Sequence, residues 1–190
     1  MNIQNGIKTI MTGQDLSREE ISSVMKQILT GSATETQIGA FLVSLSIKGE
    51  SVEEVIGSAE VMRKLSSKVS VDKANLVDTC GTGGVGSGIF NVSTTAAFVA
   101  SSCGAKVAKH GNRSSTRKSG SADLLEAAGV SLDLNPSQVK DCIEVVGLGF
   151  MFAPAHHSAM KYAIGPRKEL GLKTIFNLLG PLTNPAGAPN

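Results

Sequence analysis

The sequence predicts an α/β protein in which a small N-terminal helical domain precedes a domain built on a parallel sheet. Three observations support this class. The first third of the chain repeats helix-capping signals, each followed by apolar residues at helical spacing. Beyond it, short apolar runs alternate with helical stretches, the order from which parallel sheets are built. A glycine-rich loop follows the first of these apolar runs, where such sheets hold their ligands.

The helical domain is expected over residues 1–70, and it should contain three helices. Capping boxes at Ser17–Glu20, Thr34–Gln37 and Ser51–Glu54 mark the helix starts, and glycines end the first two helices. The apolar residues of these helices fall on one face, which predicts a helical packing or dimer module. These residues include Ile21, Ile28, Phe41, Leu42 and Leu45.

The α/β domain is expected over residues 71–190, with 165–185 packing back on the helical domain. Strands are predicted at Leu76–Cys80, Lys106–Lys109 and Gly149–Ala153, and helices at Ser93–Cys103, Ser121–Ala128 and Asn135–Val146. We interpret Ser93 as the N-cap of the first of these helices. Because the carboxyl ends of parallel strands share one edge, the loops after the first two strands should meet at one rim.

Both of these loops are suited to anions. The first holds five glycines between Gly81 and Gly88, which let the backbone approach a ligand closely. No acidic residue occurs between Asp78 and Asp123, so the surroundings are free of carboxylates. The second loop adds a run of cationic and polar side chains. They are Lys109, His110, Asn112, Arg113, Arg117 and Lys118. The sequence therefore predicts a phosphate site.

Composition limits the class of protein further. The chain has 190 residues, 41% of them hydrophobic and 18% charged, as in globular proteins. A net charge of +2 and 4% aromatic residues argue against a nucleic-acid partner. Cys80, Cys103 and Cys142 form no CxxC pair, which is typical of a reducing compartment. Without a membrane-length apolar run or a signal-peptide pattern, we expect a cytoplasmic protein with no membrane partner.

Other interpretations of the motifs are weaker. Gly81–Gly86 satisfies GxGxxG, but a dinucleotide fold needs a carboxylate about twenty residues further on, and none occurs there. The P-loop pattern fails because Ser87 stands at its lysine position. His156 and His157 have no third ligand at metal-site spacing, and no GxSxG occurs. A purely structural glycine turn and a solvated surface loop at 109–113 remain open alternatives.

The motifs GTGG, FNVST, KHGNRS, KSGSADLLEAAG, MFAP and FNLLGPLTNPAG resemble the anthranilate phosphoribosyltransferase family over essentially the whole chain. The resemblance implies a nucleoside phosphorylase/phosphoribosyltransferase-like fold and a step of tryptophan biosynthesis. In that step anthranilate displaces diphosphate from 5-phosphoribosyl 1-diphosphate, with Mg²⁺. Pyrimidine nucleoside phosphorylases share a helical domain, a parallel sheet and a TGG loop, and are one alternative. A non-catalytic relative that binds nucleic acid is another.

The resemblance also implies roles for individual residues, and a homodimer formed through the helical domain. It assigns no certain catalytic residue. The phosphoribosyl diphosphate is expected to contact Gly81, Gly84, Val85, Ile89, Asn91, Val92, Ser93, Thr94, Lys109, Asn112, Arg113 and Ser121, with Ser93 also reaching Mg²⁺. Anthranilate is expected to contact Gly81, His110, Asn112, Pro154, His157 and Arg167.

The chain departs from the family pattern in three ways. Val85 stands where the family usually has Asp, and Ile89 where Thr or Ser is common, so polar ligand contacts are lost. The family chain also continues beyond the length of this one, and carries an Asp-Glu pair that binds Mg²⁺. Here Glu169 is the last acidic residue. We therefore expect the front part of the enzyme, with an incomplete sheet and no appreciable activity by itself.

Overall fold

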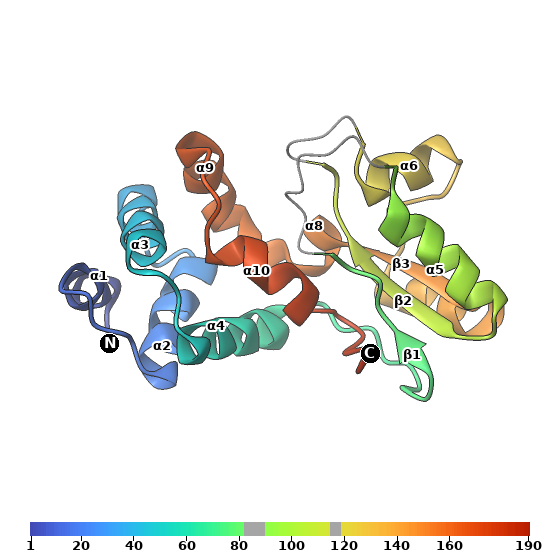
Figure 1. Ribbon diagram of the computed structural model, residues 1–190, viewed down its shortest axis with the longest axis horizontal. Helices are drawn as coiled ribbons and strands as arrows, with labels where there is room; N and C mark the ends of the chain where they lie inside the picture. The colour runs from blue at the N-terminus through green and yellow to red at the C-terminus, as the bar shows by residue number, and fades with distance from the viewer. Residues whose placement is uncertain (82–89, 115–118) are drawn as a thin grey trace. The chain divides into compact units, whose positions relative to one another are not determined.

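The computed structural model describes residues 1–81, 90–114 and 119–190 (Figure 1). They form two compact units: Met1–Ser66 with Ser158–Thr183, and Ser67–His157 with Asn184–Asn190. In this division the helices of Ser158–Thr183 belong with the N-terminal helices, whereas the expected domains were 1–70, with 165–185 packing back on it, and 71–190. Among the described residues, no helix combines the length and apolar character needed to cross a bilayer.

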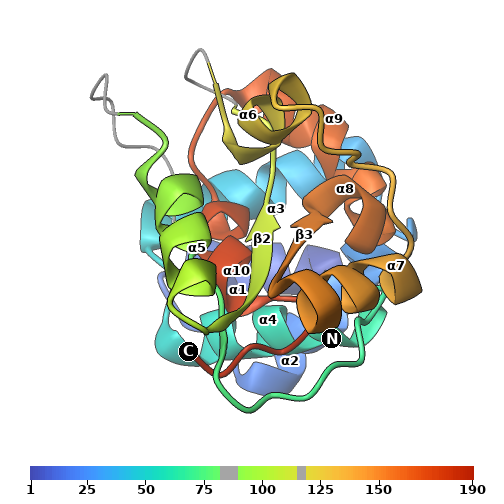
Figure 2. The same cartoon turned by 90° about the vertical axis from the view of Figure 1, so that its right-hand side faces the viewer.

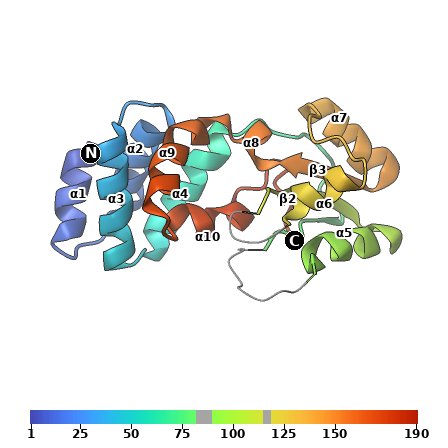
Figure 3. The same cartoon turned by 90° about the horizontal axis from the view of Figure 1, so that it is seen from above.

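The first unit is entirely helical, as Figure 3 shows. The three predicted helices begin at their predicted capping boxes, with Ser17, Thr34 and Ser51 as N-caps. A further helix precedes them, capped by Asn2 without a box. The α-helices are α1 (Ile3–Met11), α2 (Arg18–Leu29), α3 (Glu35–Lys48), α4 (Val52–Leu65), α9 (Lys161–Leu170) and α10 (Ile175–Leu182), with a short 3-10 turn at Ser158–Met160.

The apolar faces of these helices form one core inside the unit. Ile21, Ile28, Phe41, Leu42 and Leu45 are all buried in it, together with Ile175 and Leu179 from α10. The faces that suggested a dimer module are therefore used within the unit, and that reason for a dimer is wrong. The large apolar side chains left exposed on α1, α3 and α4 include Met11, Ile47 and Val52.

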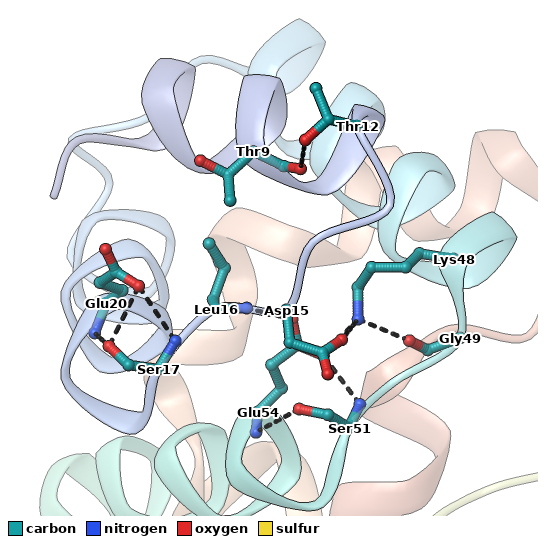
Figure 4. A network of polar contacts seen from close by, with 10 residues as sticks. All are labelled: Thr9, Thr12, Asp15, Leu16, Ser17, Glu20, Lys48, Gly49, Ser51 and Glu54. Carbon is teal, nitrogen blue, oxygen red and sulfur yellow. Dashed lines mark hydrogen bonds and ion pairs between the residues drawn. The ribbon is translucent and has the colours of Figure 1, made fainter.

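A buried ion pair joins the start of α4 to the end of α3 (Figure 4). The carboxylate of Glu54 is fully buried. It accepts hydrogen bonds from Lys48 Nζ at 2.9 Å, Leu16 N at 2.9 Å and Ser51 N at 2.8 Å. Burial lowers the pKa of Lys48, but hydrogen bonds to Asp15 and Glu54 outweigh it and leave that pKa raised. The buried Glu54 carboxylate is thus paired with the Lys48 ammonium and hydrogen-bonded through both of its oxygens.

The second unit confirms the predicted α/β class. Its strands β1 (Leu76–Val77), β2 (Lys106–Gly111) and β3 (Leu148–Phe152) form a parallel sheet in the order β1-β2-β3. The helical elements are α5 (Val92–Ser102), α6 (Ser121–Ala127), α7 (Pro136–Asp141), a π-helical turn (Cys142–Val146) and α8 (Ala153–His156).

Helices cover both faces of this sheet (Figure 2). Ala108 and Met151 pack against Val139 and Ile143 of α7 and the π-helical turn. On the opposite face, Phe150 packs against Ala122 and Leu125 of α6. Gly149 permits the close approach of α7 and the π-helical turn, since a Cβ at that position would lie 2.8 Å from Val139 O and 2.6 Å from Ile143 Cγ1.

Strand β1 is shorter than the predicted Leu76–Cys80. Asp78 N donates to Asn190 O at 2.7 Å, so a backbone segment from the other end of the chain lies beside β1 at this point. The Asp78 carboxylate then accepts from Cys80 N at 3.0 Å, which turns the chain out of the sheet. The turn begins three residues before Gly81, and places the start of the glycine loop at the carboxyl edge.

Candidate phosphate site at the carboxyl edge of the sheet

The start of α5 lies two residues earlier than predicted. Asn91, not Ser93, is the N-cap, and its Oδ1 accepts from Thr94 N at 3.3 Å and Thr94 Oγ1 at 2.9 Å. An amide at the N-cap satisfies the helix amides as well as a hydroxyl does. Ser93 is therefore free of the capping role and lies in the first turn beside the exposed Val92.

Lys109 is the central cation of this edge. Its side chain is 1% exposed, and Nζ donates to Thr79 Oγ1 at 3.1 Å and Ser93 Oγ at 3.4 Å. The residues thus come from three separate segments: the end of β1, the first turn of α5 and β2. Burial lowers the pKa of Lys109, and the charge of Asp78 partly offsets this. Two hydroxyl groups thus hold the Lys109 ammonium at this edge.

Asp78 directly follows β1 and is hydrogen-bonded to the neighbouring strand β2. Its Oδ1 accepts from His110 N at 3.1 Å, and its Oδ2 from Asn184 Nδ2 at 2.7 Å. Burial raises the pKa of Asp78, and these hydrogen bonds oppose the shift. Asp78 and Asn184 were missed by sequence reasoning, although Asn184 lies within the TNPAG motif.

The predicted histidines are only partly brought together. The rings of His110 and His157 lie 5.1 Å apart, centroid to centroid, at 54°. His156, in contrast, contacts the backbone of Ser67, whose carbonyl oxygen lies 2.8 Å from His156 Nδ1. The two consecutive histidines therefore have different partners, in keeping with their failure as a metal motif. Pro154 is exposed in the short helix α8.

The loop after β2 begins with Asn112 and Arg113, both exposed. Asn112 Oδ1 accepts from Arg113 N at 2.7 Å, and Ser121 opens α6 half-buried. Arg113 is ion-paired with Asp123 and Glu126. Hydrogen bonds from Gly120 N and Ser114 N, and then from Arg113, lower the pKa of Asp123.

Arg167 belongs to α9 of the helical unit. Its guanidinium carbon lies 5.2 Å from the centre of the Phe176 ring, a cation–π arrangement. Burial lowers the pKa of Arg167.

Gly81 is exposed at the end of the described part of the glycine loop. Gly84, Val85, Ile89, Arg117 and Lys118 lie outside the described residues.

One group of possible metal ligands occurs within the described part of the chain. Ligand atoms of Asp78, Cys80 and His110 lie within 4.8 Å of one another. Burial, and then the charge of Asp78, raise the pKa of Cys80 to about 11, so its thiol is protonated at neutral pH. Asp78 already accepts three hydrogen bonds. We therefore interpret this group as a hydrogen-bonded structural junction.

Comparisons with known proteins agree with this geometry. The model of a glycosyl transferase family, helical bundle domain, matches residues 4–66, and that of a glycosyl transferase family, a/b domain, matches 73–190. The anthranilate phosphoribosyltransferase of Ectopseudomonas mendocina is 61% identical over 188 residues, covering 99% of this chain and 54% of that protein. The anthranilate phosphoribosyltransferase of Hahella chejuensis is 62% identical, and the match covers 98% of this chain and 54% of that protein.

Solved structures of anthranilate phosphoribosyltransferases have a fold similar to that of this chain. The crystal structure of anthranilate phosphoribosyltransferase from Thermus thermophilus is similar with a TM-score of 0.91 and 45% identity, covering 96% of this chain and 56% of that one. The structure of anthranilate phosphoribosyltransferase from Saccharomyces cerevisiae in complex with PRPP and Mg is similar with a TM-score of 0.87 and 31% sequence identity. The match covers 97% of this chain and 55% of that one. The chain thus spans about half the length of the relatives it matches.

Proposed function

This chain belongs to the glycosyl transferase family, in both its helical-bundle and its a/b domain, and on that premise we propose that it acts as an anthranilate phosphoribosyltransferase. The reaction transfers the phosphoribosyl group of 5-phosphoribosyl 1-diphosphate (PRPP) to anthranilate, yielding N-(5-phosphoribosyl)anthranilate and diphosphate, a step of tryptophan biosynthesis. The observation that carries the proposal is the buried Lys109 ammonium at the carboxyl edge of the sheet.

The phosphate site is proposed to form around Lys109 and the first turn of α5. As diphosphate leaves, negative charge develops on it while the ribose becomes cation-like. Preorganised donors stabilise such charge, and Lys109 with the amides at the start of α5 are donors of this kind. The amine of anthranilate itself attacks carbon 1 as the bond to diphosphate breaks, so no protein nucleophile is needed. Asn91, Ser93, Thr94 and Ser121 complete the described part of the site.

Mg²⁺ is proposed to bind with PRPP at Ser93. Magnesium prefers oxygen ligands and is often held by few protein groups together with substrate phosphates. Ser93 Oγ is such an oxygen, and Asn91 Oδ1 lies 3.4 Å from it. These residues fit the ion as partners of a diphosphate-bound cation. When bound, Mg²⁺ would neutralise charge on the leaving group.

The residues proposed to contact anthranilate are Gly81, His110, Asn112, Pro154, His157 and Arg167. A planar guanidinium suits the anthranilate carboxylate. In the full-length protein, we expect Arg167→Ala to raise the KM for anthranilate about tenfold or more, because a charge-assisted hydrogen bond contributes roughly 1.5–3 kcal/mol. The KM for PRPP should hardly change in steady-state kinetics.

Lys168→Ala is the matched control for Arg167→Ala, since Lys168 is the exposed neighbouring cation of the same helix. Its kinetics should match those of the wild type. If Arg167→Ala changes the KM values of both substrates equally, Arg167 does not recognise anthranilate.

We also propose a homodimer formed through the helical unit. Ile47, which is 81% exposed on α3, is a candidate interface residue, because burial of such a side chain is favourable. Sedimentation velocity at micromolar concentration should show a dimer, and Ile47→Glu should shift it toward the monomer. Val146→Glu, at a 72% exposed apolar position of the α/β unit, should leave the dimer intact. A monomeric wild type would exclude this assembly.

The proposed reaction is tested by following anthranilate fluorescence. Fluorescence should fall when a full-length protein that contains this chain, Mg²⁺, PRPP and anthranilate are all present. It should stay constant when any one is left out, or when residues 1–190 alone replace the full-length protein. A parallel reaction with phosphate and a pyrimidine nucleoside tests the phosphorylase alternative. Phosphorolysis with unchanged anthranilate fluorescence would favour that alternative instead.

A further inference from the structure

The loop after β2 is held at its two ends by one carboxylate. Asp123 Oδ2 accepts from Ser114 N at 3.2 Å and from Gly120 N at 2.7 Å. These two amides lie before and after the loop, and α6 supplies the carboxylate. We call the two flanking segments, Asn112–Ser114 and Gly120–Asp123, the loop neck. Asp123 therefore joins both sides of the neck.

The two sides of the neck are also in direct contact. A Cβ at Gly120 would lie 2.4 Å from Ser114 N and 2.7 Å from Arg113 C, so only glycine fits there. Ala122 N donates to Asn112 O at 3.3 Å. Asn112 and Ser121 are both proposed substrate contacts, and both lie within the neck. Their positions depend on how the neck is held.

Arg113 completes the neck from the outside. Its Nη1 lies 3.0 Å from Asp123 Oδ1 and 2.7 Å from Glu126 Oε2, and its Nη2 lies 3.0 Å from Glu126 Oε1. The guanidinium carbon is 5.8 Å from the centre of the Phe152 ring. To bind a phosphate, this guanidinium would have to leave two carboxylates that themselves repel the phosphate.

From this geometry we infer that Arg113, Asp123 and Glu126 are positioning residues, which hold Asn112 and Ser121 in place for the substrates. This inference rests on the proposed function for the identity of those substrates. It replaces the direct phosphate contact that the family resemblance implies for Arg113. These three residues affect substrate binding indirectly, by holding the backbone of the neck.

Removal of Glu126 distinguishes a positioning role of Arg113 from direct phosphate binding, because the two roles predict opposite changes in PRPP affinity. Glu126 is exposed and is thirteen residues from Arg113 along the chain. If Arg113 positions the neck, Glu126→Ala should weaken PRPP binding with Mg²⁺ only about two- to fivefold, since an exposed ion pair contributes little net free energy. If Arg113 binds phosphate directly, the same change frees the guanidinium and should leave binding equal or tighter.

Titration calorimetry with PRPP and Mg²⁺ provides the measurement, in a cycle with Arg113→Ala and the double variant. For a positioning role, the double variant should bind no worse than Arg113→Ala alone, because both changes break one network. Glu144→Gln is the control, since Glu144 is also an exposed ion-paired glutamate of the α/β unit, with Lys140 at 3.8 Å. It should not change binding.

Hydrogen exchange tests the neck without any ligand. In Asp123→Asn the amides of Ser114 and Gly120 should exchange on the order of tenfold faster than in the wild type, because one shared charged acceptor is lost. Unchanged exchange at both amides would overturn the inference, as would tighter PRPP binding by Glu126→Ala. A wild type that binds no PRPP would refute the proposed function, while the exchange result would still decide the role of the neck.

Discussion

Replacing Lys109 with methionine is expected to reduce PRPP affinity and transferase turnover on the order of 100-fold, the loss typical of removing one preorganised donor to developing charge. Methionine keeps an unbranched, apolar side chain out to the Cε position and lacks the ammonium. Lys109 is 1% exposed and its ammonium donates to Thr79 and Ser93, so the substitution removes the donor of both hydrogen bonds. Titration calorimetry and steady-state kinetics measure the two effects.

Lys106→Met is the matched control for Lys109→Met. Lys106 begins the same strand, but its side chain is 35% exposed and lies 3.6 Å from Asp72. Surface ion pairs contribute little, so PRPP affinity should stay within about twofold of the wild type. If the two variants lose affinity equally, Lys109 has no special role at this edge.

The second large effect concerns stability. Glu54→Ala is expected to destabilise the helical unit by roughly 3–5 kcal/mol, the usual loss when one partner of a buried ion pair is removed. The substitution leaves Lys48 without its buried partner, and Leu16 N and Ser51 N without their acceptor. The midpoint of thermal unfolding should fall by roughly 6–20 °C, as followed by circular dichroism.

Glu53→Ala provides the control for Glu54→Ala. Glu53 precedes Glu54 in the first turn of α4 and is exposed. Its replacement should change stability by no more than about 0.5 kcal/mol. Equal stability of the Glu54→Ala variant and the wild type would show that the ion pair contributes nothing to the fold.

Much of the helical unit was predictable because its signals are local. The capping boxes at Ser17, Thr34 and Ser51 involve residues three positions apart, and each one starts a helix. Helices α9 and α10 were not predicted. Pro166 and Pro181 lie inside them, and proline usually argues against a helix interior. Their helical form depends on packing with the N-terminal helices, which sequence patterns do not show.

The candidate site was predictable only where a motif contains the residue. Lys109 and Ser93 were found in this way, and the structure brings them together beside Thr79. The junction of Asp78 with Asn184 was not found, because its two residues are 106 positions apart. Arg113 was found, but its ion pairs with Asp123 and Glu126 depend on how α6 packs. Charge alone could not distinguish a phosphate ligand from a positioning residue.

The most direct test is the balance of products formed by a purified full-length protein that contains this chain. With Mg²⁺, PRPP and anthranilate, phosphorus NMR should show one free diphosphate for each anthranilate consumed, and Lys109→Met should slow both changes together. Diphosphate release at the same rate without anthranilate would show hydrolysis rather than transfer. Unchanged PRPP in the presence of all components would contradict the proposed function itself.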